Sequence, residues 1–144
     1  MSAAVQPKRQ WVVGFLLDTD AEMVVLIRKN RPRWQLGRLN GVGGKVEPGE
    51  TLDAAMRREF TEETGVYVQD WHHFATLTWE EGLVHFFRSF KDPIVLERCR
   101  TMTDESVERH RVHTLNMPGP GATSSPRTCS GSFLSPPTAT TPTT

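Results

Sequence analysis

Residues 44–66 read GKVEPGETLDAAMRREFTEETGV and contain the clearest structural signals of the chain. The central part of this stretch predicts a helix over Thr51–Thr64, because Thr51 is a good N-cap and Gly65 stands where a left-handed residue ends a helix. Asp53 lies in the first turn, where the helix dipole favours negative charge. Four apolar residues recur at helical spacing and are expected to face the core: Leu52, Ala55, Met56 and Phe60.

Three glutamates of this predicted helix share one face. Glu59, Glu62 and Glu63 stand at positions i, i+3 and i+4, which brings their carboxylates close together. Like charges so placed repel, at a cost of roughly 0.2–0.5 kcal/mol per pair. Taken alone, the glutamates are compatible with a solvated acidic face. A divalent cation would offset the repulsion, and Mg²⁺, or Mn²⁺ in its place, prefers such oxygen ligands.

The fixed residues around the glutamates add a second, more specific pattern. Gly44, Glu50 and the run Arg58–Val66 match the Nudix box at its fixed positions, with Phe60 where an aliphatic residue is usual. The chain therefore resembles the Nudix family. The resemblance implies an α/β fold, an α/β/α sandwich with a mixed β-sheet, in which the box forms a loop, a helix and a loop. It also implies hydrolysis of a nucleoside diphosphate linked to another moiety.

The resemblance assigns roles to the charged residues of the box. Glu59 and Glu63 are expected to be the principal metal ligands, and Glu62 a further ligand or a water-positioning group. Arg58 is expected to orient the glutamates through salt bridges, and Glu50 to support the loop. With Mg²⁺ bound, such a site activates water for in-line attack on phosphorus.

The glycine-rich segment before the helix is expected to complete the phosphate site. Glycines at 43 and 44 let the backbone approach a ligand closely. In some family members the carbonyl that corresponds to Gly43 binds the metal, and Gly44 is expected to lie beside the substrate. Lys45 adds a positive charge suited to a phosphate.

Two further segments resemble MutT-like nucleoside triphosphatases, a group that includes enzymes clearing oxidised purine nucleotides. The first is Gly37–Lys45, in which Asn40 would contact a purine base; alternatively, Asn40 only supports a turn before glycine. The second is Thr103-Asp104-Glu105, which resembles a segment whose glutamate is an extra metal ligand or base. Glu105 is therefore either that group or an ordinary loop carboxylate.

The rest of the chain reads mainly as strands. Trp11–Leu17 and Met23–Ile27 are apolar runs that could form a hairpin across an Asp-Thr-Asp turn. Residues 104–115 are ambiguous between helix and strand. Four other runs are expected to be extended: Val66–Val68, Phe74–Trp79, Leu83–Phe90 and the short Ile94–Leu96.

Composition divides the chain into a polar leader (residues 1–9), a Nudix domain (10–116) and a tail (117–144). The tail has six prolines, twelve serines or threonines and one charged residue, Arg127, so we expect it to be disordered. It stands where the family has a closing helix, which we expect to be missing. The abrupt change suggests a shifted reading frame, and loss of the helix would damage the base pocket and expose the sheet.

The remaining composition limits the partners and the compartment. A formal net charge of zero argues against a nucleic acid polymer as partner. The two cysteines lie in dissimilar surroundings and no signal peptide or membrane span is visible, so we expect a cytoplasmic protein. We also expect a monomer or a weak homodimer. The leading hypothesis is Mg²⁺-dependent hydrolysis of a (d)NTP to NMP and pyrophosphate. The alternatives are ADP-ribose or dinucleoside polyphosphate hydrolysis, a nucleotide-binding module without turnover, and a nonfunctional product.

Overall fold

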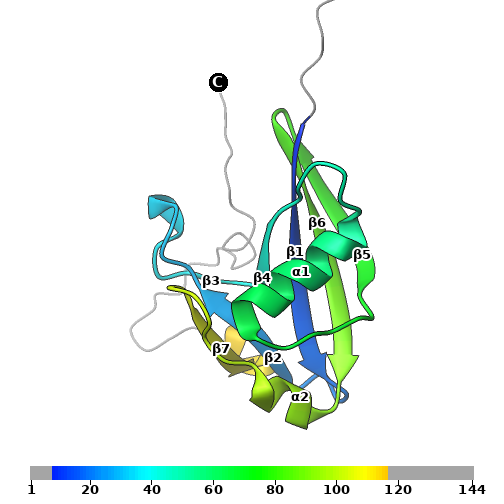
Figure 1. Cartoon of the computed structure of the whole chain (residues 1–144). Coiled ribbons are helices and arrows are strands. Elements are labelled where there is room, and N and C mark those ends of the chain that lie inside the picture. Colours follow the sequence, from blue (N-terminus) through cyan, green and yellow to red (C-terminus); the bar gives the residue numbers. More distant parts are fainter. Residues whose placement is uncertain (1–7, 117–144) are drawn as a thin grey trace, which may run out of the picture.

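A computed structural model describes residues 8–116 of the chain. The chain forms a mixed seven-stranded sheet with two helices on one side of it (Figure 1). The strands are β1 (Arg9–Asp18), β2 (Met23–Arg28), β3 (Leu39–Asn40), β4 (Val42–Lys45), β5 (His72–Trp79), β6 (Gly82–Lys91) and β7 (Ser106–Arg111). The helices are α1 (Leu52–Thr64) and α2 (Pro93–Arg98), and short 3₁₀ turns cover Arg33–Gln35 and Val112–Asn116.

The central strand β1 organises the sheet. It pairs in parallel with β6 over its whole length, while its other edge is shared by two antiparallel partners. The first half of β1 pairs with β4, from Trp11 opposite Lys45 to Gly14 opposite Val42, and the second half pairs with β2. Strand β5 lies beyond β6, and β7 lies beside β2. The mixed sheet and the β1–β2 hairpin are thus confirmed.

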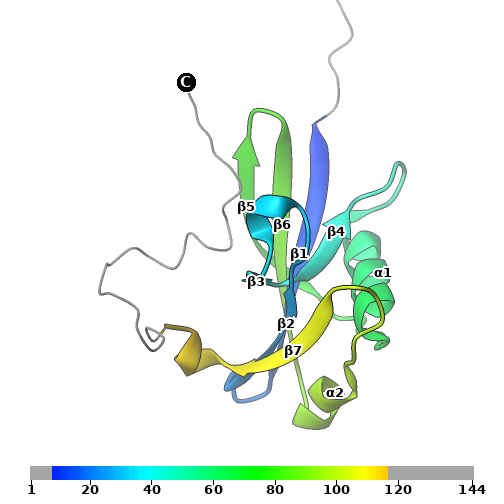
Figure 2. The same ribbon diagram turned by 90° about the vertical axis from the view of Figure 1, so that its left-hand side faces the viewer.

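Helix α1 has the ends that its sequence predicts. The Thr51 hydroxyl accepts a hydrogen bond from the amide of Ala54, and Gly65 adopts a left-handed φ of 78° at the C-terminal end. Met56 and Phe60 are fully buried in a core with Val12 and Phe87 of the sheet. Both helices lie on this side of the sheet (Figure 2).

The opposite side of the sheet carries its own row of apolar side chains. Phe15 of β1 stacks on Phe86 of the neighbouring β6, and Trp11 of β1 stacks across β6 on Trp79 of β5. Within residues 8–116 no helix packs on this side. The tail, and with it the expected loss of the closing helix, lies outside the described residues. No helix of the described part is long and apolar enough to cross a membrane.

Three expectations about local structure were wrong or imprecise. Ile94–Leu96 is not a strand but part of α2, because Asp92 caps the helix and Pro93 occupies its first turn. Val66–Val68 is irregular; it connects α1 to β5 and packs Val68 into the core without pairing as a strand. Strand β1 begins at Arg9, within the segment expected to be a leader, and the ambiguous residues 104–115 contain β7.

Candidate active site

Helix α1 and strand β4 bring the box residues together. The α1–β4 approach is so close that a Cβ at Gly44 would overlap the carboxyl group of Glu59. A Cβ at Gly43 would overlap the backbone of Val12 on β1. Gly43 therefore requires glycine because backbone occupies the space of a side chain, whereas a side chain at Gly44 would displace the carboxyl end of Glu59. The Glu59 side chain is only 13% exposed, pressed between the helix and the glycine strand.

Arg58 is the hub of the charged network. Its guanidinium donates to both oxygens of Glu50, at 2.7 and 2.9 Å, and to Glu59 at 2.8 Å. It also donates to the carbonyl of Lys45 at 3.1 Å and lies 3.5 Å from Glu62. One side chain therefore ties the helix to the loop and to the end of β4, which is the orienting geometry expected for Arg58.

Burial and the contacts with Arg58 shift the pKa values of the carboxyl groups in opposite directions. Hydrogen bonds from Arg58 lower the pKa of Glu50. Burial raises the pKa of Glu59, and this effect outweighs the opposing contacts with Arg58. Burial also raises the pKa of Glu63, against a hydrogen bond from Thr103. The helix thus holds two half-buried carboxyl groups that a neighbouring positive charge would stabilise in their ionised form.

The three glutamates have different surroundings. Glu59 accepts from Arg58, Glu63 accepts from the Thr103 hydroxyl at 3.0 Å, and the Glu62 side chain is 57% exposed. Among residues 8–116 no three acidic, histidine or cysteine side chains already converge as a metal-binding group. The donor set nevertheless suits a hard cation, because its members are carboxylates on one helix face beside a strand that has no side chains at Gly43 and Gly44.

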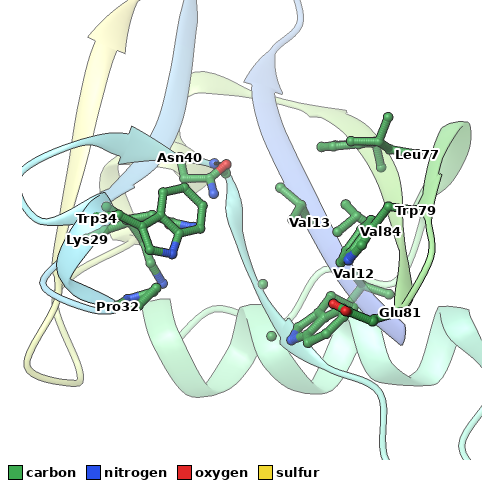
Figure 3. Close-up of a pocket in the computed structure, with 16 residues that line it drawn as sticks. Val12, Val13, Lys29, Pro32, Trp34, Asn40, Leu77, Trp79, Glu81 and Val84 are labelled. Atoms are coloured by element: carbon green, nitrogen blue, oxygen red, sulfur yellow. Dashed lines mark hydrogen bonds between the residues drawn. The ribbon is translucent and has the colours of Figure 1, made fainter. Parts of the chain in front are cut away.

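A cavity of about 460 Å³ adjoins this site on the glycine strand. Figure 3 shows its two walls, with Trp34, Pro32 and Asn40 facing Leu77, Trp79 and Val84. Gly43 and Gly44 line it as well, so the strand that abuts Glu59 also borders the cavity. Aromatic walls with a few polar groups are typical of sites for small planar ligands.

The other three candidate residues lie in different surroundings. Asn40 lines the cavity, and its side-chain oxygen also accepts from the amide of Gly41 at 2.8 Å, so the turn-supporting role is present. Lys45 is exposed at the end of β4. Glu105 is 5% exposed and accepts from Lys29 Nζ and from the amide of Asn30, at 3.0 and 2.7 Å.

Several cavity residues escaped the sequence interpretation. Trp11 and Glu81 line the cavity without belonging to any motif, and Phe86 lines it beside them. The available signal was the alternation of side chains along β1 and β6, which sends Trp11 and Phe86 away from α1. Trp34 and Trp79, whose flat faces could stack on a base, also line the cavity.

Comparisons with known proteins agree with this architecture. The model of the NUDIX domain matches residues 7–121. The oxidized purine nucleoside triphosphate hydrolase of Danio rerio is 39% identical over 56 residues, which are 39% of this chain and 36% of that protein. The NAD-capped RNA hydrolase NudC of Chromobacterium violaceum is 36% identical over 64 residues, 40% of this chain and 24% of that protein. The matched region thus spans about a third or less of these relatives.

Solved structures show the same fold. A MutT structure, from a comparison of the Aliivibrio salmonicida and Vibrio cholerae proteins, superimposes with a TM-score of 0.61 at 21% identity. The match covers 74% of this chain and 81% of that chain. At this identity the likeness supports the fold alone. Because the family model covers most of the chain and the box residues assemble as its motif predicts, the chain belongs to the NUDIX domain family.

Proposed function

We propose that the chain is a Mg²⁺-dependent pyrophosphohydrolase whose substrate is a nucleoside triphosphate, hydrolysed to a monophosphate and pyrophosphate. The observation that carries the proposal is the shared position of Gly43 and Gly44. Both residues line the aromatic cavity, and Gly44 also abuts the carboxylate of Glu59. A base in the cavity would therefore place its phosphates along the glycine strand towards the box helix.

The box residues divide the work of the proposed reaction. Glu59, Glu62 and Glu63, with the carbonyl of Gly43, would hold the metal, which when bound neutralises phosphate charge and activates water. Arg58 fixes the Glu59 carboxylate by a charge-assisted hydrogen bond of 2.8 Å. Lys45, exposed beside Gly44, offers its ammonium to a phosphate. Glu105 stays a prediction as an additional ligand or base.

The cavity supports a purine as the base. Trp34 and Trp79 present flat apolar faces from opposite walls, and Asn40 presents an amide that can donate to a base edge (Figure 3). The Danio rerio relative, by its name, acts on oxidised purine nucleoside triphosphates, which agrees with this choice. We therefore place canonical and oxidised purine dNTPs first among the substrates, ahead of ADP-ribose and dinucleoside polyphosphates.

Turnover assays test the proposal. Wild type is incubated with Mg²⁺ and a panel of canonical and oxidised dNTPs, ADP-ribose and diadenosine polyphosphates, and the products are separated. Glu63→Gln is expected to lower kcat by at least about 100-fold, the loss typical when one transition-state-stabilising group is removed. Glu97→Gln, the same change on the exposed face of α2, is the matched control and is expected to retain activity.

Each outcome decides between the alternatives. Unchanged activity in Glu63→Gln contradicts the metal assignment. Turnover of ADP-ribose or dinucleotides in place of dNTPs moves the substrate to the first alternative. Binding of nucleotide without product favours a module that holds nucleotides without turnover.

A further inference from the structure

The wall of the cavity that carries Trp34 is a ten-residue loop, residues 29–38, between β2 and β3. Its base is closed by backbone hydrogen bonds, from Lys29 to the carbonyl of Arg38 and from Gly37 to the carbonyl of Lys29. The loop contains no fully buried residue, so its own packing cannot fix its position. Contacts from elsewhere in the chain must do so.

The C-terminal leg of the loop is held through Arg28. The guanidinium of Arg28 donates to the carbonyl of Gly37 at 2.8 Å. The same group forms a two-pronged pair with Glu108 of β7, at 2.6 and 2.8 Å. Glu108 is fixed in turn by the hydroxyl of Ser106 and the imidazole of His110, at 3.1 and 2.8 Å.

The N-terminal leg of the loop is held by the residues just before β7. Both oxygens of Asp104 accept from Arg31, at 2.8 and 3.1 Å, and the Asp104 carbonyl accepts from the Asn30 side chain. The buried Glu105 carboxylate accepts from the amides of Asn30 and Arg31. Residues 104–108 thus hold both ends of the 29–38 loop through hydrogen bonds, with Arg28 joining Glu108 to the C-terminal end.

We propose that residues 104–108 act as a clamp that sets the position of the 29–38 loop, and that Glu108 and Arg28 are positioning residues for the substrate held in the cavity. The identity of that substrate rests on the proposed function. Carboxylates that accept several charge-assisted hydrogen bonds give directional, strong restraints. Neither Arg28 nor Glu108 lines the cavity, so they act only through the loop.

Two parts of the site would then have separate roles. The box helix would carry the chemical step, and the clamp would set how well the base is held. A wall that moves by about 0.5–1 Å loses about a quarter to a half of the dispersion energy of its contacts with the base. Loosening the clamp should therefore weaken substrate binding and leave the chemical step nearly intact.

The test uses Glu108→Gln, Arg28→Gln and the double variant in the full chain. The control is Asp70→Asn, which removes an exposed ion pair with Lys91 of 2.9 Å, away from the loop. Hydrogen exchange of the 29–38 amides is expected to rise about tenfold or more in the clamp variants and to stay unchanged in the control. KM for the best dNTP is expected to rise about tenfold with kcat within about twofold.

The double variant is expected to be no worse than the stronger single variant, because both residues belong to one contact. Unchanged loop exchange, or a fall in kcat with KM unchanged, would overturn the proposal. The proposal would also be overturned if hydrogen exchange of the loop became faster while KM and the dissociation constant of a monophosphate product, dGMP, stayed unchanged. If wild type neither turns over nor binds any nucleotide, the proposed function fails, and exchange alone then decides whether the clamp orders the loop.

Discussion

Replacing Arg58 by methionine tests the charged hub of the box, because the variant keeps much of the side-chain volume and removes the guanidinium. Wild-type Arg58 makes three short charge-assisted hydrogen bonds, two to Glu50 and one to Glu59. Each such bond contributes about 1.5–3 kcal/mol, and bonds made by one group are not additive. The Arg58 side chain is 24% exposed, so solvent screens part of the effect.

We expect the free energy of unfolding to fall by about 3 kcal/mol, near the lower end of the cost of breaking a buried pair. For a domain of this size the loss corresponds to a fall in Tm of about 10–15 °C. Urea titration followed by tryptophan fluorescence measures it. Arg57→Met is the matched control, because within residues 8–116 the Arg57 guanidinium donates a single exposed bond of 3.2 Å, to the carbonyl of Gln69. The control should lose less than about 1 kcal/mol.

The destabilisation should depend on pH with a defined sign. Arg58 lowers the pKa of Glu50 in the folded chain. The ionised Glu50 therefore stabilises the fold above the pKa it has in the unfolded chain, and this contribution is lost as the pH falls through the folded pKa. Without Arg58 the pKa of Glu59, already raised by burial, rises further. In the variant, the carboxylates that Arg58 normally contacts carry uncompensated negative charge at pH 7. They carry less at about pH 4, near the ordinary pKa of glutamate, so the destabilisation should be smaller there. Equal losses in Arg58→Met and Arg57→Met, or a loss that grows at low pH, would refute the reasoning.

Three further outcomes follow from single positions. Gly44→Ala should abolish turnover while the chain stays folded by circular dichroism, because the new Cβ displaces the Glu59 carboxyl group; an active variant contradicts the packing. Gly65→Ala should cost about 1 kcal/mol in urea titrations, since φ there is 78°, and an unchanged midpoint would argue against the left-handed cap. Burial raises the pKa of the Cys99 thiol to about 11, so alkylation of its peptide at pH 8 should be slow until denaturant is added.

Much of the fold was predictable from local signals that agree with one another. In α1 the cap, the apolar spacing and the terminal glycine all favour the same helix, and the structure confirms it. The β-branched run of α2 predicts a strand, but the preceding Asp92 and Pro93 are start signals for a helix and decide the outcome. Short segments of this kind depend on their first residue as much as on their apolar content.

The site was predictable only where one motif contains it. Arg58 lies eight positions after Glu50 and next to Glu59 in the sequence, and its side chain contacts both, as the box pattern predicts. The cavity walls come from β1, β5 and the 29–38 loop, whose meeting depends on strand order and not on spacing. The surroundings of Glu105 were equally inaccessible, because Lys29 and Asn30 lie more than seventy residues away along the chain.

The parallel pairing of β1 with β6 also has a consequence for synthesis on the ribosome. Every pair from Arg9 opposite Gly82 to Asp18 opposite Lys91 joins the beginning of the domain to a strand made much later. At 5–20 residues per second the first strand waits roughly 4–15 s for its principal partner. During that interval only the β1–β2 hairpin, β4 and α1 can form around it, and the apolar Trp11–Leu17 edge needs protection. The centre of the sheet therefore forms late, when β6 emerges, and β7 is added to β2 after it.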